Sequence, residues 1–319
     1  MSLKPLALLA ALALPGGLPG AALAQAVTVY TAGPADLIEN LAAGFQAATG
    51  TRVDVFQATT GQVMARLEAE AASPVADIVI SASADTARAF DAKGMLQPHG
   101  AANAATVPDF LKAETWVAQG VAALAIAWNP ASGTPRPTDW ADLAAEPFKD
   151  LVTMPDPASS GSAYELLSAL SASPDYGWDL FEKLGANGMI VPGANAQAMN
   201  PVLQGAKAAV FGAVDYIAFN RQAAGESLEV IVPASGTVIA PRPMMILATA
   251  PNPDGARAFI DYVLSDAGQA MVAAVNLMPA RADVPASRPL IADLKVMGVD
   301  PAADRAATLA RFSAAVGKP

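Results

Sequence analysis

Short apolar runs alternate along the chain with stretches in which apolar residues recur at helical spacing. Within residues 34–49, Leu37, Leu41 and Phe45 repeat every four positions, which is typical of a helix that buries one face. The first half of the chain contains predicted strands at 27–30, 51–56 and 77–81, and predicted helices at 34–49, 62–72 and 84–93. This alternation of strand and helix predicts a doubly wound α/β sheet.

The rest of the chain repeats the alternation. Predicted strands at 151–154 and 208–211 are followed by predicted helices at 161–171 and 214–223, and residues 253–274 predict one long helix. Extended runs without an adjoining helix lie at 116–128 and at 229–233 with 238–248. We expect these runs to carry the chain from one lobe to a second lobe and back.

The pattern therefore predicts an α/β protein of two lobes joined by extended hinge strands, each lobe a doubly wound α/β sheet. We expect residues 25–120 and 240–319 to form the first lobe, and residues 121–239 to form the second. About 295 residues are enough for two lobes with separate cores.

Residues 1–24 have the pattern of a secretory signal. Lys4 precedes an apolar run from Pro5 to Leu14, and Ala22-Leu23-Ala24 resembles a signal peptidase site. A membrane anchor is the alternative, but a span needs about 20 apolar residues. We expect cleavage and a periplasmic protein.

Composition narrows the chemistry. The chain has no cysteine and one histidine, so thiol nucleophiles are excluded, and a zinc or copper site is not expected. His99 lies in a loop-like stretch, and no G-x-S-x-G motif is present, so we expect no catalytic residue, no metal and no cofactor. A net charge of −10 argues against nucleic acid and anionic membranes as partners.

Small hydroxyl residues and glycine gather where predicted strands pass into helices. Since ligands of open α/β sheets bind outside the carboxyl ends of the strands, and helix N-termini attract anions, these positions predict an anion site. The alternative for each is a simple helix cap, and Thr59 with Gln62 fits a capping box. The candidates are Thr31, Thr59, Thr60, Gly61, Ser81, Ser83, Ser159, Ser160 and Gly161, with Asp215 and Tyr216 from the last helix start.

Several segments are similar to ABC-transporter periplasmic solute-binding proteins, above all to the ferric-binding, hexose-phosphate and 2-aminoethylphosphonate subgroup. They are the runs 27–32, 60–67, 76–80, 83–86, 156–164, 214–218 and 258–268. The resemblance implies the type II periplasmic-binding-protein fold. It also implies capture of a small-molecule solute between the lobes, and delivery to an ABC permease in the inner membrane by a binding protein that we expect to be monomeric.

The departures from that subgroup bear on the solute. Ferric-binding members use two adjacent tyrosines, whereas here Tyr216 lies between Asp215 and Ile217. Iron is therefore ranked below a phosphate- or phosphonate-bearing solute. Asp215 is either a first-turn acid of its helix or the site of a ligand ammonium. Arg242, between two prolines, either reaches the cleft or lies on an exposed loop, and we expect the loop. An exported hydrolase is the alternative from another functional class.

Overall fold

Ten strands form the central sheet of the computed structural model, which describes residues 25–298 and 304–317. The predicted signal peptide, residues 1–24, lies outside the described residues. The main path of the sheet runs β2-β1-β3-β9-β5-β7-β6; off this path, β4 pairs with β9, and β8 and β10 pair with β5. The strands are β1 Val27–Thr31, β2 Val53–Gln57, β3 Ile78–Ile80, β4 Leu96–Gln97, β5 Trp116–Trp128, β6 Val152–Thr153, β7 Ala209–Val214, β8 Glu229–Ile231, β9 Ile239–Leu247 and β10 Met278–Pro279.

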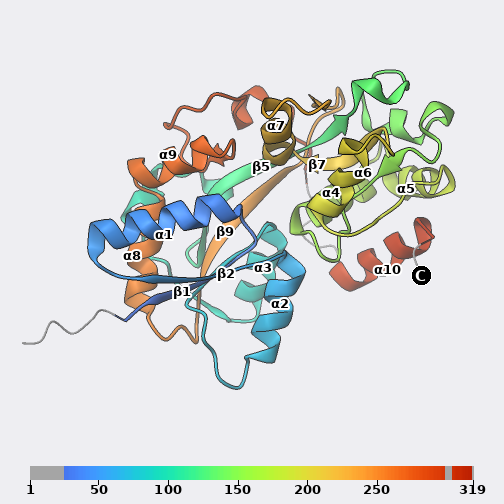
Figure 1. Ribbon diagram of the computed structural model, residues 1–319. Coiled ribbons are helices and arrows are strands. Elements are labelled where there is room, and N and C mark those ends of the chain that lie inside the picture. Colours follow the sequence, from blue (N-terminus) through green and yellow to red (C-terminus); the bar gives the residue numbers. More distant parts are fainter. Residues whose placement is uncertain (1–24, 299–303, 318–319) are drawn as a thin grey trace, which may run out of the picture.

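Helices cover both faces of the sheet at each of its ends (Figure 1). The first lobe consists of β1, β2 and β3 with the helices around them, and the second lobe is built around β6 and β7. The α-helices are α1 Ala35–Thr49, α2 Thr60–Ala69, α3 Ala84–Ala92, α4 Gly161–Ala172, α5 Gly177–Ala186, α6 Asn195–Leu203, α7 Asp215–Ala223, α8 Pro253–Val263, α9 Asp266–Ala274 and α10 Arg305–Ala315.

Alternation along β1 explains why helices pack on both of its faces. Val29 belongs to the core shared with α1, where Phe45 meets Phe259 of α8 at 5.3 Å between ring centroids. Its neighbour Tyr30 belongs to the core shared with Val63 of α2. Successive side chains of a strand point to opposite faces, so an unbroken apolar run requires a cover on each.

Two long strands connect the lobes, as Figure 1 shows for β5 and β9. In β5, residues 116–118 and 121–123 pair with β9, and residues 124–128 pair with β7. Both strands are buried over their whole length. The two lobes joined by extended strands that the sequence predicts are therefore the architecture of this chain.

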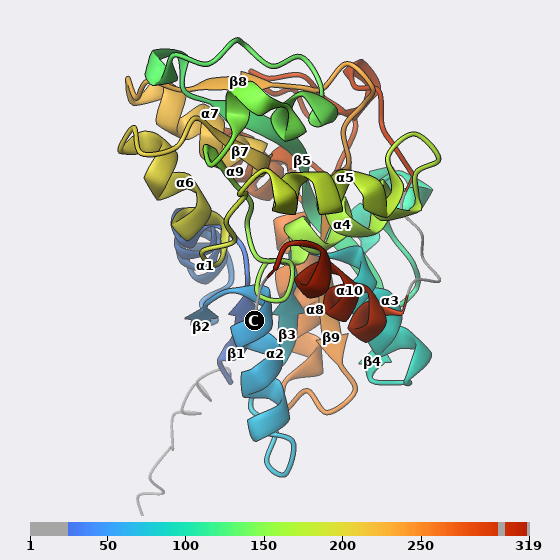
Figure 2. The same cartoon turned by 90° about the vertical axis from the view of Figure 1, so that its right-hand side faces the viewer.

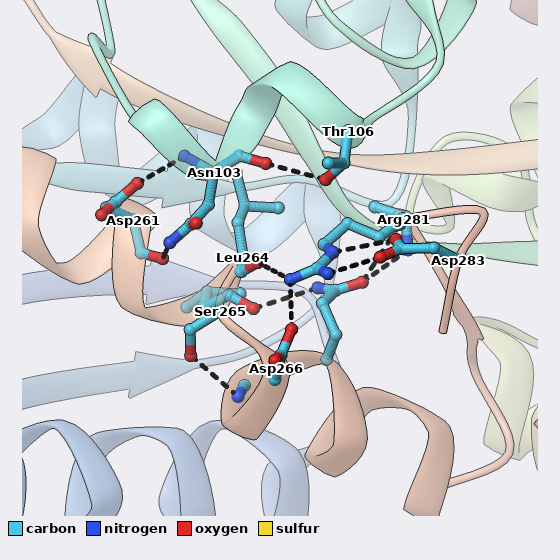
Figure 3. A network of polar contacts seen from close by, with 12 residues as sticks. Asn103, Thr106, Asp261, Leu264, Ser265, Asp266, Arg281 and Asp283 are labelled. Carbon is cyan, nitrogen blue, oxygen red and sulfur yellow. Dashed lines mark hydrogen bonds and ion pairs between the residues drawn. The ribbon is translucent and has the colours of Figure 1, made fainter. Parts of the chain in front are cut away.

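The single helix predicted over residues 253–274 is wrong, because the chain breaks between α8 and α9. The Ser265 hydroxyl accepts from the Gly268 N–H at 3.2 Å and donates to the Tyr262 carbonyl at 2.6 Å. Arg281 donates to the Leu264 carbonyl at 3.1 Å and pairs with Asp266 at 2.7 Å (Figure 3). Side chains thus satisfy groups that a continuous helix would have paired internally.

Three helices were not predicted from the sequence: α5, α6 and α10. The last, α10, packs on α5, where the Phe312 ring lies 5.8 Å from the Phe181 ring. Figure 2 shows α10 in front of the molecule, close to α4. The last described helix therefore lies on a helix from the middle of the chain.

Candidate functional site

A cleft of about 940 Å³ lies between the lobes. Its wall is formed by the starts of α1 and α2 from the first lobe, and by the starts of α4 and α6 with one side of α7 from the second. Pockets for organic ligands are typically about 300–1,000 Å³. The size of the cleft therefore suits an organic molecule.

Six of the residues predicted from the sequence line this cleft: Thr59, Thr60, Ser159, Ser160, Gly161 and Tyr216. Two of their hydroxyls cap helices. Thr59 and Gln62 form the predicted capping box, and the Ser160 hydroxyl accepts from the Ala163 N–H at 3.3 Å. Ser160 also donates to Asn195 at 3.0 Å. These two hydroxyls are therefore engaged within the protein.

The other hydroxyl candidates lie away from the cleft wall. Thr31 accepts from the Gly33 N–H at 3.0 Å, and Ser81 donates to Thr86 at 2.9 Å. Ser83 donates to the Glu165 carboxylate at 2.6 Å. All three side chains are buried, and none of these residues lines the cleft.

The two candidate glycines serve contact between the lobes. The Gly61 N–H donates to the Ser159 carbonyl at 3.2 Å. A Cβ at Gly161 would lie 2.9 Å from the Thr60 hydroxyl and 3.0 Å from the Ala82 carbonyl carbon. The absence of a side chain at both positions lets the two lobes approach each other at the edge of the cleft.

Asp215 is a buried structural acid. Its carboxylate pairs with Arg288 and accepts from the N–H groups of Ala123 at 2.9 Å and Tyr216 at 2.7 Å. Burial raises the pKa of Asp215, and the Arg288 guanidinium opposes that shift. The side chain is 2% exposed and does not line the cleft, so the structure gives no support to an ammonium site at Asp215.

Arg242 is buried in β9, so the expectation of an exposed loop was wrong. The side chain is 1% exposed. It donates to the Ala32 carbonyl at 3.0 Å and to the Tyr216 hydroxyl at 3.3 Å, and its Nε has no partner. Within the described part of the chain, no carboxylate pairs with this guanidinium, and both of its partner residues line the cleft.

Polar side chains that were not singled out from the sequence complete the wall: Asp36, Gln57, Gln62, Asn195, Gln197, Asn220 and Arg221. Asp36, Gln57 and Gln62 lie within five positions of a predicted hydroxyl residue, and Asn220 and Arg221 lie within five positions of Tyr216. The same helix-start pattern, extended by about one turn, could have found these five. Asn195 and Gln197 lie at the start of α6, which was not predicted. Asp36 and Arg221 supply one carboxylate and one further guanidinium to the wall.

Residues 73–303, more than half of the chain, match the family of bacterial extracellular solute-binding proteins. The chain belongs to this family. No curated protein sequence matches it.

Solved structures of periplasmic binding proteins share its fold. AfuA from Actinobacillus pleuropneumoniae, solved with fructose-6-phosphate, has a TM-score of 0.84 at 21% identity over 93% of this chain and 100% of AfuA. The substrate-binding protein of an ABC transporter from Agrobacterium tumefaciens gives 0.82, at 20% identity over 93% and 96%. Iron-bound HitA from Pseudomonas aeruginosa gives 0.75, at 19% identity over 92% and 97%.

The single histidine of this solute-binding protein does not line the cleft. His99 is 7% exposed; its Nε2 lies 3.1 Å from the Ala113 carbonyl, and its Nδ1 accepts from the Ala101 N–H at 3.2 Å. Across residues 25–298 and 304–317, no three His, Cys, Asp or Glu side chains are placed to hold a metal ion. The helices in these ranges are too short or too polar to cross a membrane.

Proposed function

We propose that this chain is the periplasmic solute-binding component of an ABC importer. It captures a small anionic or zwitterionic solute that carries a phosphate or phosphonate group, and delivers it to an inner-membrane permease. The protein acts as a monomer. The family supports capture of a solute, and the polar groups in and beside the cleft wall support an anionic one.

The observation that supports an anionic solute is the buried Arg242, which contacts the cleft-lining Tyr216. The Tyr216 hydroxyl accepts from Arg242, which leaves its own proton to donate elsewhere. Burial raises the pKa of Tyr216, against the influence of Arg242, so the phenol is neutral and can donate. A buried guanidinium without a counter-ion is costly, and a bound anion would offset that cost.

The rest of the wall supports an organic solute. Gln62, Asn195 and Gln197 bring carboxamides into the cleft, which suit hydroxyl or amine groups of a ligand. If the solute carries an ammonium, its partner is Asp36, the carboxylate among the cleft-lining residues that the structure describes, and not Asp215.

Ferric iron is the second candidate, because HitA, a structural neighbour, is iron-bound. Iron(III) favours several hard anionic oxygens. The cleft wall offers one tyrosine, Tyr216, and the burial that raises its pKa disfavours the tyrosinate that iron would bind. We therefore rank iron below the phosphorus-containing solute.

Titration calorimetry tests this ranking. The panel contains 2-aminoethylphosphonate, hexose phosphates, inorganic phosphate, molybdate and ferric citrate, with native mass spectrometry of the protein as purified to detect a retained ligand. We expect tight binding of a phosphorus-containing organic solute. Binding of Fe(III) alone, with a tyrosinate charge-transfer band, would reverse the order of the two candidates.

The exported hydrolase remains the alternative of another class. Its test is turnover of a generic phosphate ester by the purified protein. We expect none, because the cleft wall brings together one carboxylate, Asp36, and no imidazole. Turnover that survives repeated purification and is lost in a cleft variant would support the hydrolase.

We propose further that β5 and β9 act as the hinge. The sequence predicts residues 25–120 and 240–319 in the first lobe, and residues 121–239 in the second. With this hinge, the assignment of α10 to the first lobe changes. Since α10 packs on α5, it moves with the second lobe. Closure by hinge motion is a common response of two-domain binding proteins to a ligand.

A further inference from the structure

A buried carboxylate joins the two lobes outside the cleft. Glu165 belongs to α4 of the second lobe, and its side chain is 1% exposed. It accepts from the Ser83 hydroxyl at 2.6 Å and from the Asp85 N–H at 3.1 Å, both at the start of α3 in the first lobe. None of these three residues lines the cleft.

The position of Glu165 makes this contact favourable. Ser83 is the N-cap of α3, so the carboxylate lies at the end of the helix where N–H groups lack internal partners and carry partial positive charge. Hydrogen bonds to a charged acceptor are stronger than those between neutral groups. Separation of the lobes at this point would leave the carboxylate to be solvated by water instead.

Arg305 makes a second connection between the lobes. Its guanidinium pairs with Asp85 of the first lobe at 3.2 Å. It also lies 3.9 Å from the centroid of the Tyr164 ring and donates to the Pro157 carbonyl at 3.4 Å, both in the second lobe. One side chain at the start of α10 thus contacts both lobes.

The rest of α10 packs on the second lobe. Phe312 packs on Phe181 of α5, and the Arg311 guanidinium lies 4.5 Å from the centroid of the Trp178 ring. Figure 2 shows α10 passing from α5 toward the part of the molecule that holds α3. The helix is therefore fixed at one end, with Arg305 reaching the other lobe.

We propose that Glu165 and Arg305 form a latch between the lobes, which holds the closed arrangement when no solute is bound. The latch borders the cleft, because Gly161, which lines the cleft, lies beside Ser83. It makes no contact with the solute and acts through the fraction of protein that is closed. If breaking it lowers that fraction tenfold, the apparent Kd rises about tenfold.

The inference depends on the proposed hinge but not on the identity of the solute, so its test uses solute-free protein. The chain has no cysteine, which allows two spin labels at Lys93→Cys and Lys183→Cys. Lys93 follows α3 in the first lobe, and Lys183 lies on α5 in the second; both are exposed. Pulsed electron paramagnetic resonance then reports the distance between the lobes.

We expect Glu165→Ala and Arg305→Ala, each in the labelled background, to shift the distance distribution of solute-free protein to longer values. Arg311→Ala is the matched control, because it removes an arginine of the same helix whose ring partner lies in the same lobe. It should leave the distribution unchanged. Circular dichroism establishes that each variant is folded before the distances are compared.

Unchanged distributions in both latch variants would overturn the proposal and make this contact a fixed part of the hinge. If Glu165→Ala does not fold, the result for Arg305→Ala decides alone, because that side chain is partly exposed and its removal is less disruptive. Failure of every solute in the calorimetric panel would count against the proposed solute class and would leave this distance measurement unaffected.

Discussion

Two arginines lie buried beside consecutive residues at the start of α7, and their surroundings differ. Arg288 pairs with Asp215, whose carboxylate also accepts two backbone N–H groups. Arg242 contacts the next residue, Tyr216, through a neutral hydroxyl and keeps one nitrogen without a partner. The first arginine is neutralised inside the protein, and the second is left with its charge beside a cleft.

This difference separates a structural charge from a charge held for a ligand. A buried ion pair is close to neutral for stability, and removing one partner of it is strongly destabilising. A buried charge that already lacks a partner gains from an incoming anion. Substitution of Asp215 should therefore lower the stability of the protein, and substitution of Arg242 should weaken the binding of the solute.

The largest effect is expected from Asp215→Ala, which leaves Arg288 buried and unpaired. The free energy of unfolding should fall by about 3–5 kcal/mol, as measured by urea denaturation. Arg52→Ala is the control, because the Arg52–Asp54 pair is exposed and should contribute within about 1 kcal/mol. Equal losses of stability in the two variants would contradict a structural role for Asp215.

Arg242→Met should have the opposite profile. The substitution removes the guanidinium and keeps an apolar chain of similar length, so stability should hold or rise. Binding of an anionic solute, measured by calorimetry with the panel member that binds wild type, should weaken by about 2–5 kcal/mol. Unchanged affinity with a large loss of stability would make Arg242 a second structural arginine.

Glu165 is a third case, a buried acid held mainly by neutral donors. Burial raises its pKa above the ordinary 4.5, opposed by Ser83, the Asp85 N–H and nearby Arg88, while the Asp85 charge raises it further. The contact between Glu165 and Asp85 has further neighbours, because Arg305 pairs with Asp85 and lies over the Tyr164 ring. An acid with a raised pKa in the folded state stabilises the protein below its unfolded pKa, and that contribution is lost as pH rises through the folded pKa.

Glu165→Gln tests this sign. Urea midpoints of wild type should fall, relative to those of the variant, as pH rises from 4.5. Other titrating groups, such as Asp215, contribute equally to the pH dependence of both proteins, so their contributions cancel in the difference. Parallel curves over the whole range would show that Glu165 titrates with the same pKa in the folded and unfolded states.

Most strands and helices could be predicted because their signals are local. The spacing of Leu37, Leu41 and Phe45 specifies the buried face of α1 without reference to the rest of the chain. The break after α8 has a local signal too, since Ser265 caps α9 three residues before Gly268. It was missed because the apolar periodicity continues across the break.

The site was predictable only in outline. Helix starts at the ends of strands located the cleft, and six of eleven predicted residues line it. Which hydroxyls face a ligand depends on long-range packing, as with Ser83, whose partner Glu165 is 82 residues away. Arg242 was misjudged because its flanking prolines resemble a loop, whereas here they pair across an irregular stretch of β5 in the middle of the sheet.

The smallest effect on stability is expected from the titration of His99. This buried imidazole needs no counter-charge, because it is neutral. Burial lowers its pKa below 6.5, with Lys112 acting in the same direction and the Ala113 carbonyl opposing. A base with a lowered pKa costs stability as pH falls below its unfolded pKa, since the unfolded chain binds the proton more readily. The chain has one histidine, so a single imidazole resonance in an NMR titration reports the value directly. A pKa at or above 6.5 would show that His99 contacts solvent or a carboxylate. It would contradict the interpretation of His99 as a buried, neutral side chain without a charged partner.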